Sequence, residues 1–342
     1  RKADADAKKK ADTDAKTKAE ADAKRKADAD AKAKADAKAK AEADAKRKAD
    51  ADAKAKANSE QAKAAAAKKA EPKAPAAKQL SLELWPDAVR GVPNAVLRGA
   101  LFGVSQKRAT HKKRTVIAAV DGYEIRFLGT TFNQTDLDVW ETLLQLARLQ
   151  PLGTKVEFTA HSILKELDRG TGKTQHEQLK EELARLGAGW TEITWVKEKK
   201  TFAGNLISSF FRDEETGRYV VKFNADMAQL YGVGHTLIDW AERQALGSNS
   251  LAKWLHGFYA SHAQPFPYKA QTIQGLCGST VERLGDFRKL LRAALAQLVA
   301  VGAIKSWSID AKTDLVEVVN VPSQTQLKHL VKAPKRPKSN PS

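Results

Sequence analysis

Residues 272–309, TIQGLCGSTVERLGDFRKLLRAALAQLVAVGAIKSWSI, carry the pattern that decides the fold. A short apolar run predicts a helix over Thr272–Cys277, and Gly278-Ser279 follows it as a turn. The spacing of Leu, Phe and Ala after this turn predicts a long helix over Leu284–Val301. Two helices joined by so short a turn indicate a helix-turn-helix unit.

The residues on either side complete this unit. A helix is predicted over Leu251–His262, before the two helices. Two strands, Ala303–Ile309 and Leu315–Val319, follow the long helix and enclose a turn at Asp310–Asp314. Three helices followed by a β-hairpin are typical of a winged-helix domain.

A similar order of elements occurs earlier in the chain. It begins with two strands on either side of Asp121-Gly122, a dipeptide that favours a hairpin turn. Thr135 and Asp138 resemble a capping box at the start of the next helix, with Asp in place of the usual Glu. The predicted elements are strands at Thr115–Val120 and Tyr123–Leu128, a helix at Thr135–Leu149, a strand at Lys155–Phe158, helices at Thr159–Leu167 and Thr174–Leu186 around a turn at Arg169–Lys173, and strands at Glu192–Val196, Thr201–Phe211 and Arg218–Phe223.

These patterns predict an α+β protein with two tandem winged-helix domains behind a long N-terminal tail that is rich in Ala, Lys and Asp and is either helical or disordered. The expected parts are a low-complexity charged tail with a Pro-containing linker (1–78), a second linker with a short helix (79–113), a first winged-helix domain (114–224), a second winged-helix domain (225–321) and a basic disordered C-terminal tail (322–342).

The N-terminal tail repeats a unit close to KADADAKR and contains nothing more apolar than Ala, so it has no face to bury. Asp precedes Lys by four residues repeatedly, as in Asp4 and Lys8, which supports an exposed helix or a semi-rigid spacer. Such a segment can bind DNA without sequence preference or extend the reach of the protein. An inert solvated spacer has the same composition, and both interpretations stay open.

Charge and composition narrow the function classes. The net charge of the 342 residues is +18. Residues 1–78 hold 24 Lys/Arg and 15 Asp/Glu and the remainder holds 35 and 26, so the region after the tail is basic by itself. A basic globular region favours a nucleic acid or an anionic membrane as partner, although solubility alone can select for charge. The single cysteine, Cys277, excludes an internal disulfide and fits a reducing compartment, and no apolar run approaches the roughly 20 residues of a membrane span.

The second helix of each helix-turn-helix is the predicted DNA-binding element. Such a helix enters the major groove, where Gln matches adenine and Arg or Lys matches guanine. A solvated helix face explains any one of these residues equally well, but the repetition in both halves favours DNA contact. The candidates are Lys173, Thr174, Gln175, Gln178 and Lys180 in the first half, Lys197, Lys199 and Lys200 as phosphate contacts in its wing, and Thr280, Arg283, Arg288, Lys289 and Arg292 in the second half. The residues assigned to the core are Leu284, Phe287, Leu290, Leu291 and Leu295.

Three other motifs do not support an enzyme. Gly172-Lys173-Thr174 suggests a phosphate-binding loop, but the first glycine of that motif falls at Leu167 and the preceding segment is a predicted helix. The seven histidines include no H-x-H pair of the kind a DNA-nicking enzyme uses for its metal. Asp136 and Asp138 diverge on a helix, so they predict cap chemistry rather than a metal pair. We expect no catalytic site, metal or cofactor.

Several short motifs resemble those of TrfA-type plasmid replication initiators, in the order of that family and over about residues 79–321. They are Pro93-Asn94-Ala95 with Ala100-Leu101-Phe102, Asp138-Val139-Trp140-Glu141, the run SHAQPFPY at 261–268, and Leu276-Cys277-Gly278-Ser279. The resemblance implies tandem winged-helix domains that bind direct repeats (iterons) in double-stranded plasmid origin DNA and open an A·T-rich element. It also implies recruitment of the host sliding clamp, the replicative helicase and the initiator DnaA, a homodimer or a monomer, and a cytoplasmic location in a bacterium.

Gln79, Leu80, Leu82 and Leu84 resemble a sliding-clamp-binding peptide within the 79–113 linker. The family often has Phe where this chain has Glu83, but the longer form with a leucine at the last position fits Leu84. In such a peptide the glutamine bonds to the rim of a pocket and the leucines fill it. A short strand packed on the first domain explains the same leucines, and both alternatives stay open.

Two further functions are compatible with this fold. A transcriptional repressor would bind a palindrome instead of direct repeats. A DNA-coating or partition protein would depend on the charged tail and show little sequence specificity.

Overall fold

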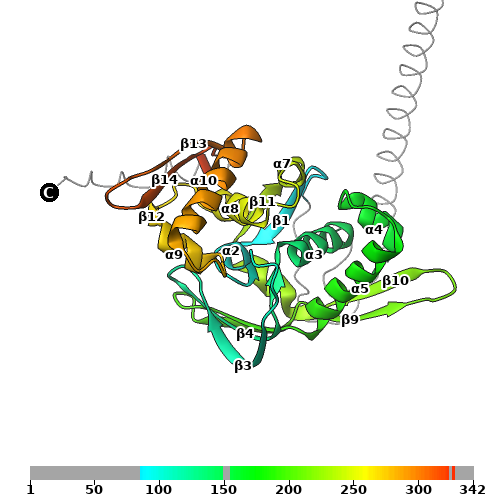
Figure 1. Ribbon diagram of the computed structural model, residues 1–342. Helices are drawn as coiled ribbons and strands as arrows, with labels where there is room; N and C mark the ends of the chain where they lie inside the picture. The colour runs from blue at the N-terminus through cyan, green and yellow to red at the C-terminus, as the bar shows by residue number, and fades with distance from the viewer. Residues whose placement is uncertain (1–84, 149–154, 323–325, 328–342) are drawn as a thin grey trace, which may run out of the picture. The chain divides into compact units, whose positions relative to one another are not determined.

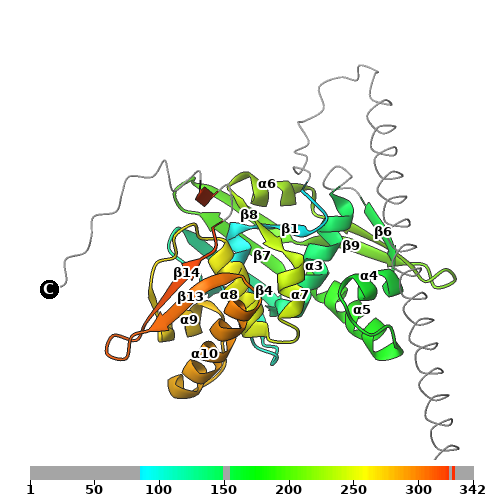
Figure 2. The same ribbon diagram turned by 90° about the horizontal axis from the view of Figure 1, so that it is seen from above.

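The computed structural model of the chain describes residues 85–148, 155–322 and 326–327. These residues belong to one compact unit, in which the buried side chains form two clusters. The first core extends from Trp85 to Trp240, and the second, apart from Val120, extends from Leu246 to Val316. Figures 1 and 2 show the elements that build each core. The predicted tail at 1–78, the peptide at 79–84 and most of the C-terminal tail lie outside the described residues.

The second core confirms the predicted order of helices and strands. Its three strands pair in antiparallel fashion, and β14 lies between β12 and β13. Helix α10 packs on α8 and α9. The elements are α8 (Ser250–Ala260), β12 (Tyr268–Lys269), α9 (Ala270–Leu276), α10 (Leu284–Ala300), β13 (Ile304–Ile309) and β14 (Leu315–Asn320).

The buried face of α10 follows Phe287, Leu291, Leu295 and Leu298, which recur at helical spacing. Phe287, Leu291 and Leu295 are therefore in the core, as predicted. The core assignment of Leu290 is wrong, because its side chain lies beside this face and is 50% exposed. Leu284 is only half-buried.

The first core repeats this order with one insertion. Strand β10 lies between β6 and β9, which is the same arrangement as that of β14 between β12 and β13. In Figure 1 the β9–β10 hairpin extends beyond α5. The elements are α3 (Gln134–Ala147), β6 (Lys155–Thr159), α4 (Ala160–Glu166), α5 (Lys173–Ala188), β9 (Ile207–Arg212) and β10 (Arg218–Phe223).

The insertion consists of two strands between α5 and β9. The run predicted as one strand over Thr201–Phe211 is instead two strands that separate at the buried Leu206 and join different sheets. The earlier half of the run pairs with the preceding strand, which in turn pairs with the predicted hairpin around Gly122, where φ is +96°. The resulting sheet has the order β3-β4-β7-β8, with β3 at Thr110–Ile117, β4 at Tyr123–Thr130, β7 at Trp190–Trp195 and β8 at Lys200–Asn205.

The segments at 85–113 and 225–245 contain several short elements, where a linker with a short helix and the start of the second domain are predicted. Strand β1 (Val89–Pro93) pairs with β11 (His235–Asp239), and β2 (Phe102–Gly103) pairs in parallel with β5 (Phe132–Asn133). The chain from 225 to 239 therefore packs with the first core. The predicted division at residue 224 stays a prediction. The remaining elements are α2 (Asn94–Leu97), a 3-10 turn at Ala225–Met227, α6 (Ala228–Gly232), β11 and α7 (Trp240–Ala245).

The first turn of α3 is capped two residues before the predicted position. Asn133, and not Thr135, is the N-cap, because its Oδ1 accepts hydrogen bonds from the backbone N–H groups of Thr135 and Asp136. Asp136 Oδ2 accepts the N–H of Asn133 at 2.9 Å and closes the capping box. The threonine hydroxyl donates to Asn133 Oδ1 at 2.7 Å. The correct box is thus Asn133 with Asp136.

We predict that Asn133→Ala lowers the free energy of unfolding by about 1–2 kcal/mol, since it leaves two N–H donors of a buried helix start without their acceptor. Thr135→Ala is the control, and it should have a smaller effect because the cap bonds remain. Urea denaturation followed by circular dichroism measures both. A larger loss for Thr135→Ala would contradict this assignment of the cap.

Candidate nucleic-acid interface

Helix α5 is the first candidate recognition helix. It begins at Lys173 after a glycine-rich turn, and its apolar side packs on α3 and β9. Because its apolar side is covered, the polar side chains at the start of α5 are the ones that can contact a ligand. The five residues predicted from the sequence all lie in its first two and a quarter turns: Lys173, Thr174 and Gln178 are exposed, and Gln175 and Lys180 are half-buried.

The outer surface of α5 has both signs of charge. Lys180 Nζ lies 3.3 Å from Glu177 Oε1, so its charge is partly neutralised on the helix itself. Glu181, one turn further, lies 3.6 Å from Arg185 Nη1. Carboxylates repel phosphates, so the basic and amide groups up to Gln178 are the part of α5 best suited to approach DNA.

The structure places the three predicted wing lysines on a different hairpin from the expected one. Lys197, Lys199 and Lys200 are exposed at the β7–β8 connection, with Lys199 at φ +51°. This connection belongs to the four-stranded sheet. The hairpin that pairs with β6, in the position of the wing, is β9–β10, and its turn holds Asp213 and Glu214. The lysines remain candidates for phosphate contact, but not as part of that wing.

Helix α10 is the second candidate recognition helix. Arg283 is its N-cap residue and is exposed, as are Lys289 and Arg292. Lys289 Nζ lies 3.1 Å from Asp286 Oδ1. Thr280 precedes the helix, with its hydroxyl oxygen 3.1 Å from that of Ser105.

Arg288 differs from the other predicted residues because it is held by the hairpin that follows α10. Its Nε and Nη2 donate to the two carboxylate oxygens of Asp314 at 2.8 and 3.0 Å. These hydrogen bonds raise the pKa of Arg288. The pair uses two of the five guanidinium N–H groups, so the donors of Nη1 remain available at the tip of the side chain.

Strand β3 carries a basic group that lies outside the predicted DNA-binding set. The register against β4 shifts between His111 and Thr115, and Lys112, Lys113 and Arg114 are consecutively exposed. The guanidinium of Arg114 lies 5.8 Å from the ring centroid of Trp190 and 3.1 Å from Glu192 Oε2. The charge density of residues 107–114 is visible in the sequence, but this segment lies before the predicted hairpin and, except for Arg114, within the predicted linker at 79–113.

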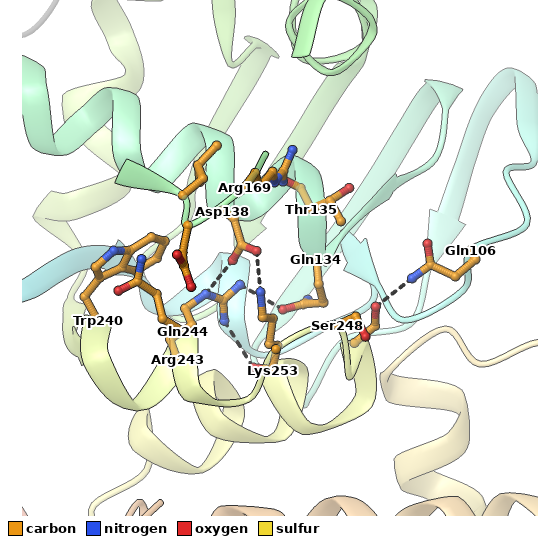
Figure 3. Close-up of a pocket in the computed structure, with 14 residues that line it drawn as sticks. Gln106, Gln134, Thr135, Asp138, Arg169, Trp240, Arg243, Gln244, Ser248 and Lys253 are labelled. Carbon is orange, nitrogen blue, oxygen red and sulfur yellow. Dashed lines mark hydrogen bonds and ion pairs between the residues drawn. The ribbon is translucent and has the colours of Figure 1, made fainter. Parts of the chain in front are cut away.

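A pocket of about 600 Å³, lined mostly by polar residues, lies where α3, α7 and α8 meet, and Figure 3 shows the side chains around it. Asp138 of α3 accepts hydrogen bonds from Arg243 Nε at 2.8 Å and from Lys253 Nζ at 2.7 Å. Both cations point at this carboxylate in Figure 3. Neither Arg243 nor Lys253 belongs to a motif that is recognisable from the sequence.

Two carboxyl groups of α3 respond differently to their burial. Burial raises the pKa of Asp138, but the charges of Arg243 and Lys253 outweigh this effect and hold the pKa below its usual value. Burial raises the pKa of Glu141 to about 7, and the charge of Arg243 only partly opposes it. Glu141 Oε2 lies 3.2 Å from Arg243 Nε, but neither of its oxygens accepts a hydrogen bond from the described residues.

Asp136 and Asp138 bind different partners. Asp136 is held by Arg108 and by Arg185, whose Nη2 lies 3.0 Å from Oδ1. Each carboxylate thus neutralises side-chain cations. Within the described ranges no cluster of His, Cys, Asp and Glu is suited to a metal ion, and no helix has the length and apolar character that a membrane crossing needs.

Comparison with known proteins identifies related chains. Residues 46–319 match the family model described as TrfA protein. The plasmid replication initiator protein TrfA of Escherichia coli is 25% identical over 235 residues, which cover 66% of this chain and 61% of the relative. The chain therefore spans less than two thirds of the length of this relative.

Two solved structures are similar at a lower level. Domains 2 and 3 of RctB align over 66% of this chain and 98% of theirs, with 12% identity and a TM-score of 0.47. The Pi initiator protein in complex with iteron DNA aligns over 54% of this chain and 91% of its own, with 14% identity and a TM-score of 0.40.

The raised pKa of Glu141 predicts a dependence of stability on pH. The folded state binds this proton more tightly than the unfolded state, so the contribution to stability is complete below pH 4.5 and is lost as pH rises through about 7. Glu141→Gln should remove this loss and make the fall in unfolding free energy between about pH 5 and pH 8 smaller by on the order of 1–3 kcal/mol.

Urea denaturation at a series of pH values measures this effect. Glu181→Gln, on the exposed side of α5, is the control and should keep the profile of the unmodified protein. An unchanged profile in Glu141→Gln would show that this carboxyl group does not titrate in that range.

Proposed function

The chain belongs to the TrfA family of plasmid replication initiators, and from this premise we propose that it binds direct repeats in the origin of its own plasmid and initiates replication there. In this proposal two winged-helix domains of one chain contact successive segments of a repeat. The protein acts as a DNA-binding initiator and not as an enzyme.

The repeated arrangement of two candidate recognition helices supports this proposal. In each core a short helix, a turn and a long helix are followed by a hairpin, and the three strands pair in the same order. A helix supported in this way can enter a major groove about 12 Å wide. Two such helices in one chain provide two positions at which base edges are contacted.

Individual side chains have different roles in this proposal. At the start of α5, Gln175 and Gln178 suit adenine, and Lys173 suits guanine or a phosphate. On α10, Arg292 is exposed, and Arg288 has donors left at its tip. The lysines at 197–200 and the basic residues of β3 supply phosphate contacts, which carry no sequence information but set the orientation of the protein.

The later steps of initiation rest on the family alone. We propose that the bound protein helps to open an A·T-rich element and recruits the host clamp, helicase and DnaA. It acts as a homodimer, a monomer or both in turn. Its location is the bacterial cytoplasm.

We predict that the whole chain protects direct repeats of its own origin at even spacing in a DNase footprint at near-physiological salt. Gln175→Ala and Arg292→Ala should each weaken specific binding by about 1–3 kcal/mol, roughly five- to 150-fold, through loss of a base contact. Lys197→Ala should instead weaken binding to all sequences alike and lower the salt slope by about 1.

Lys155→Ala is the control for these variants, because Lys155 lies on β6 and is paired with Glu157 at 2.7 Å. Protection of a single palindrome would favour a repressor. Diffuse protection that no recognition-helix variant changes would favour a DNA-coating or partition protein. Either result would contradict the proposed function.

We also propose that residues 79–84 bind the host sliding clamp. Leu82→Ala combined with Leu84→Ala should abolish retention of the clamp in a pull-down with the whole chain, because both leucines would leave the apolar pocket of the clamp unfilled. The double variant should keep the DNase footprint of the unmodified protein. Unchanged clamp retention would contradict this role.

A further inference from the structure

Asp138 connects the first core to the segment that leads into the second. It lies on α3, whereas its partner Arg243 lies on α7, between the two cores, and Lys253 lies on the first helix of the second core. Asp138 is 5% exposed and Arg243 is 1% exposed. The bridge therefore crosses from one core to the other with little access to water.

Arg243 makes further contacts with both sides of this bridge. Its Nη2 donates to Gln134 Oε1 on α3 at 3.1 Å, and its Nη1 donates to the backbone carbonyl of Lys253 at 3.2 Å. Figure 3 shows the guanidinium between these groups. The geometry of α3 relative to α8 is thus defined by a planar group with directed N–H donors at both ends.

The two helices joined by this bridge also support the two candidate recognition helices. Helix α5 packs on α3, and α10 packs on α8. A change in the position of α3 relative to α8 is therefore transmitted to α5 and α10 through packed helix pairs, which do not deform continuously.

Several other contacts between the cores have neutral acceptors, including the hydroxyl of Ser261, which accepts from Arg98 Nε at 3.1 Å. Trp254 Nε1 donates to the carbonyl of Gly99 at 3.0 Å, and Gln106 Nε2 donates to Ser250 Oγ at 2.7 Å. A neutral hydrogen bond contributes little net stability, whereas the loss of one partner from a buried ion pair leaves an uncompensated charge and costs several times more. In Asp138→Asn the carboxylate that attracts Arg243 and Lys253 to α3 would be absent, and the two cations would repel each other.

We propose that Asp138 is a positioning residue that sets the spacing between α5 and α10, and with it the separation between the two DNA segments that one chain binds within a repeat. This inference rests on the proposed function. In this inference a buried ion pair that contacts no DNA determines which spacing between the two DNA segments the protein accepts.

The consequence for DNA binding follows from simultaneous engagement. Two linked binding surfaces gain about 10²–10⁴-fold in affinity when the geometry allows both to bind, and they lose this gain when it does not. A rigid connection concentrates the gain on one spacing, because it removes the ordering that binding would otherwise require. A loose connection spreads a smaller gain over several spacings.

The test compares the whole chain and its variants on two duplexes. One is a direct repeat of its own origin, and the other has about five base pairs, half a helical turn, inserted between the segments protected by the two cores. The measured quantity is the ratio of the two dissociation constants, in which the effect of the N-terminal tail cancels. The unmodified protein should bind the interrupted repeat about a hundredfold or more weakly, and Asp138→Asn should reduce this ratio to within about tenfold.

Two further variants separate positioning from general stability. Lys253→Gln removes the more accessible of the two cations, so it should fold where Asp138→Asn does not, and it should also lower the ratio. Glu192→Gln breaks ion pairs with Arg114 and Arg126, 3.1 and 3.2 Å long and contained within the four-stranded sheet, and should leave the ratio unchanged. Circular dichroism melts establish that each variant is folded.

Each outcome decides the matter. A lowered ratio in Asp138→Asn and Lys253→Gln but not in Glu192→Gln supports the inference. An unchanged ratio in the folded Asp138 or Lys253 variant overturns it, as does an unmodified protein that tolerates the insertion. If the unmodified protein binds the intact repeat no better than a scrambled duplex, the proposed function itself fails.

Discussion

Helix α3 is buried on nearly all sides although three of its side chains, Asp136, Asp138 and Glu141, are acidic. Removing a carboxylate from water costs several kcal/mol unless a cation replaces the lost solvation. The described structure supplies cations from a loop, from α5, from α7 and from α8. They are Arg108 and Arg185 for Asp136, and Arg243 and Lys253 for Asp138. The acidic helix can therefore be buried only when four other segments are in place, and the arrangement of both cores depends on this neutralisation.

The sequence predicted the helices well and their charged contacts poorly, for a physical reason. Apolar spacing along α3, such as that of Trp140 and Leu144, shows which positions face the core. It does not show that the polar positions between them are buried too. The partners of Asp138 lie 105 and 115 residues away in the chain, and no local pattern connects them. Hence the short spacing from Asp136 to Asp138 suggested a cap, which is correct for Asp136, and gave no indication of the bridge made by Asp138.

Strand pairing set a second limit on what the sequence could predict. The predicted strands all exist in some form, because alternating β-branched and aromatic residues favour extended structure in any sheet. Their partners depend on contacts over long distances. The chain between Lys200 and Arg212 leaves one sheet and enters another at Leu206, a buried apolar residue like those of a continuous strand. Because of this single break, the lysines at 197–200 lie outside the wing, and the turn of the wing is acidic. The two candidate DNA-binding surfaces are therefore unequal.

That inequality bears on the kind of site such a chain would bind. In the second core the Asp314 carboxylate holds Arg288, so α10 and its hairpin present one connected surface. In the first core the hairpin turn carries Asp213 and Glu214, with Glu214 lying 2.6 Å from Arg212, and the exposed lysines at 197–200 lie on the four-stranded sheet instead. Two different surfaces in one chain give a binding site with a direction along the DNA. Copies that bind such sites independently do not need the twofold symmetry of a palindrome, which matches a dimer whose two surfaces are the same.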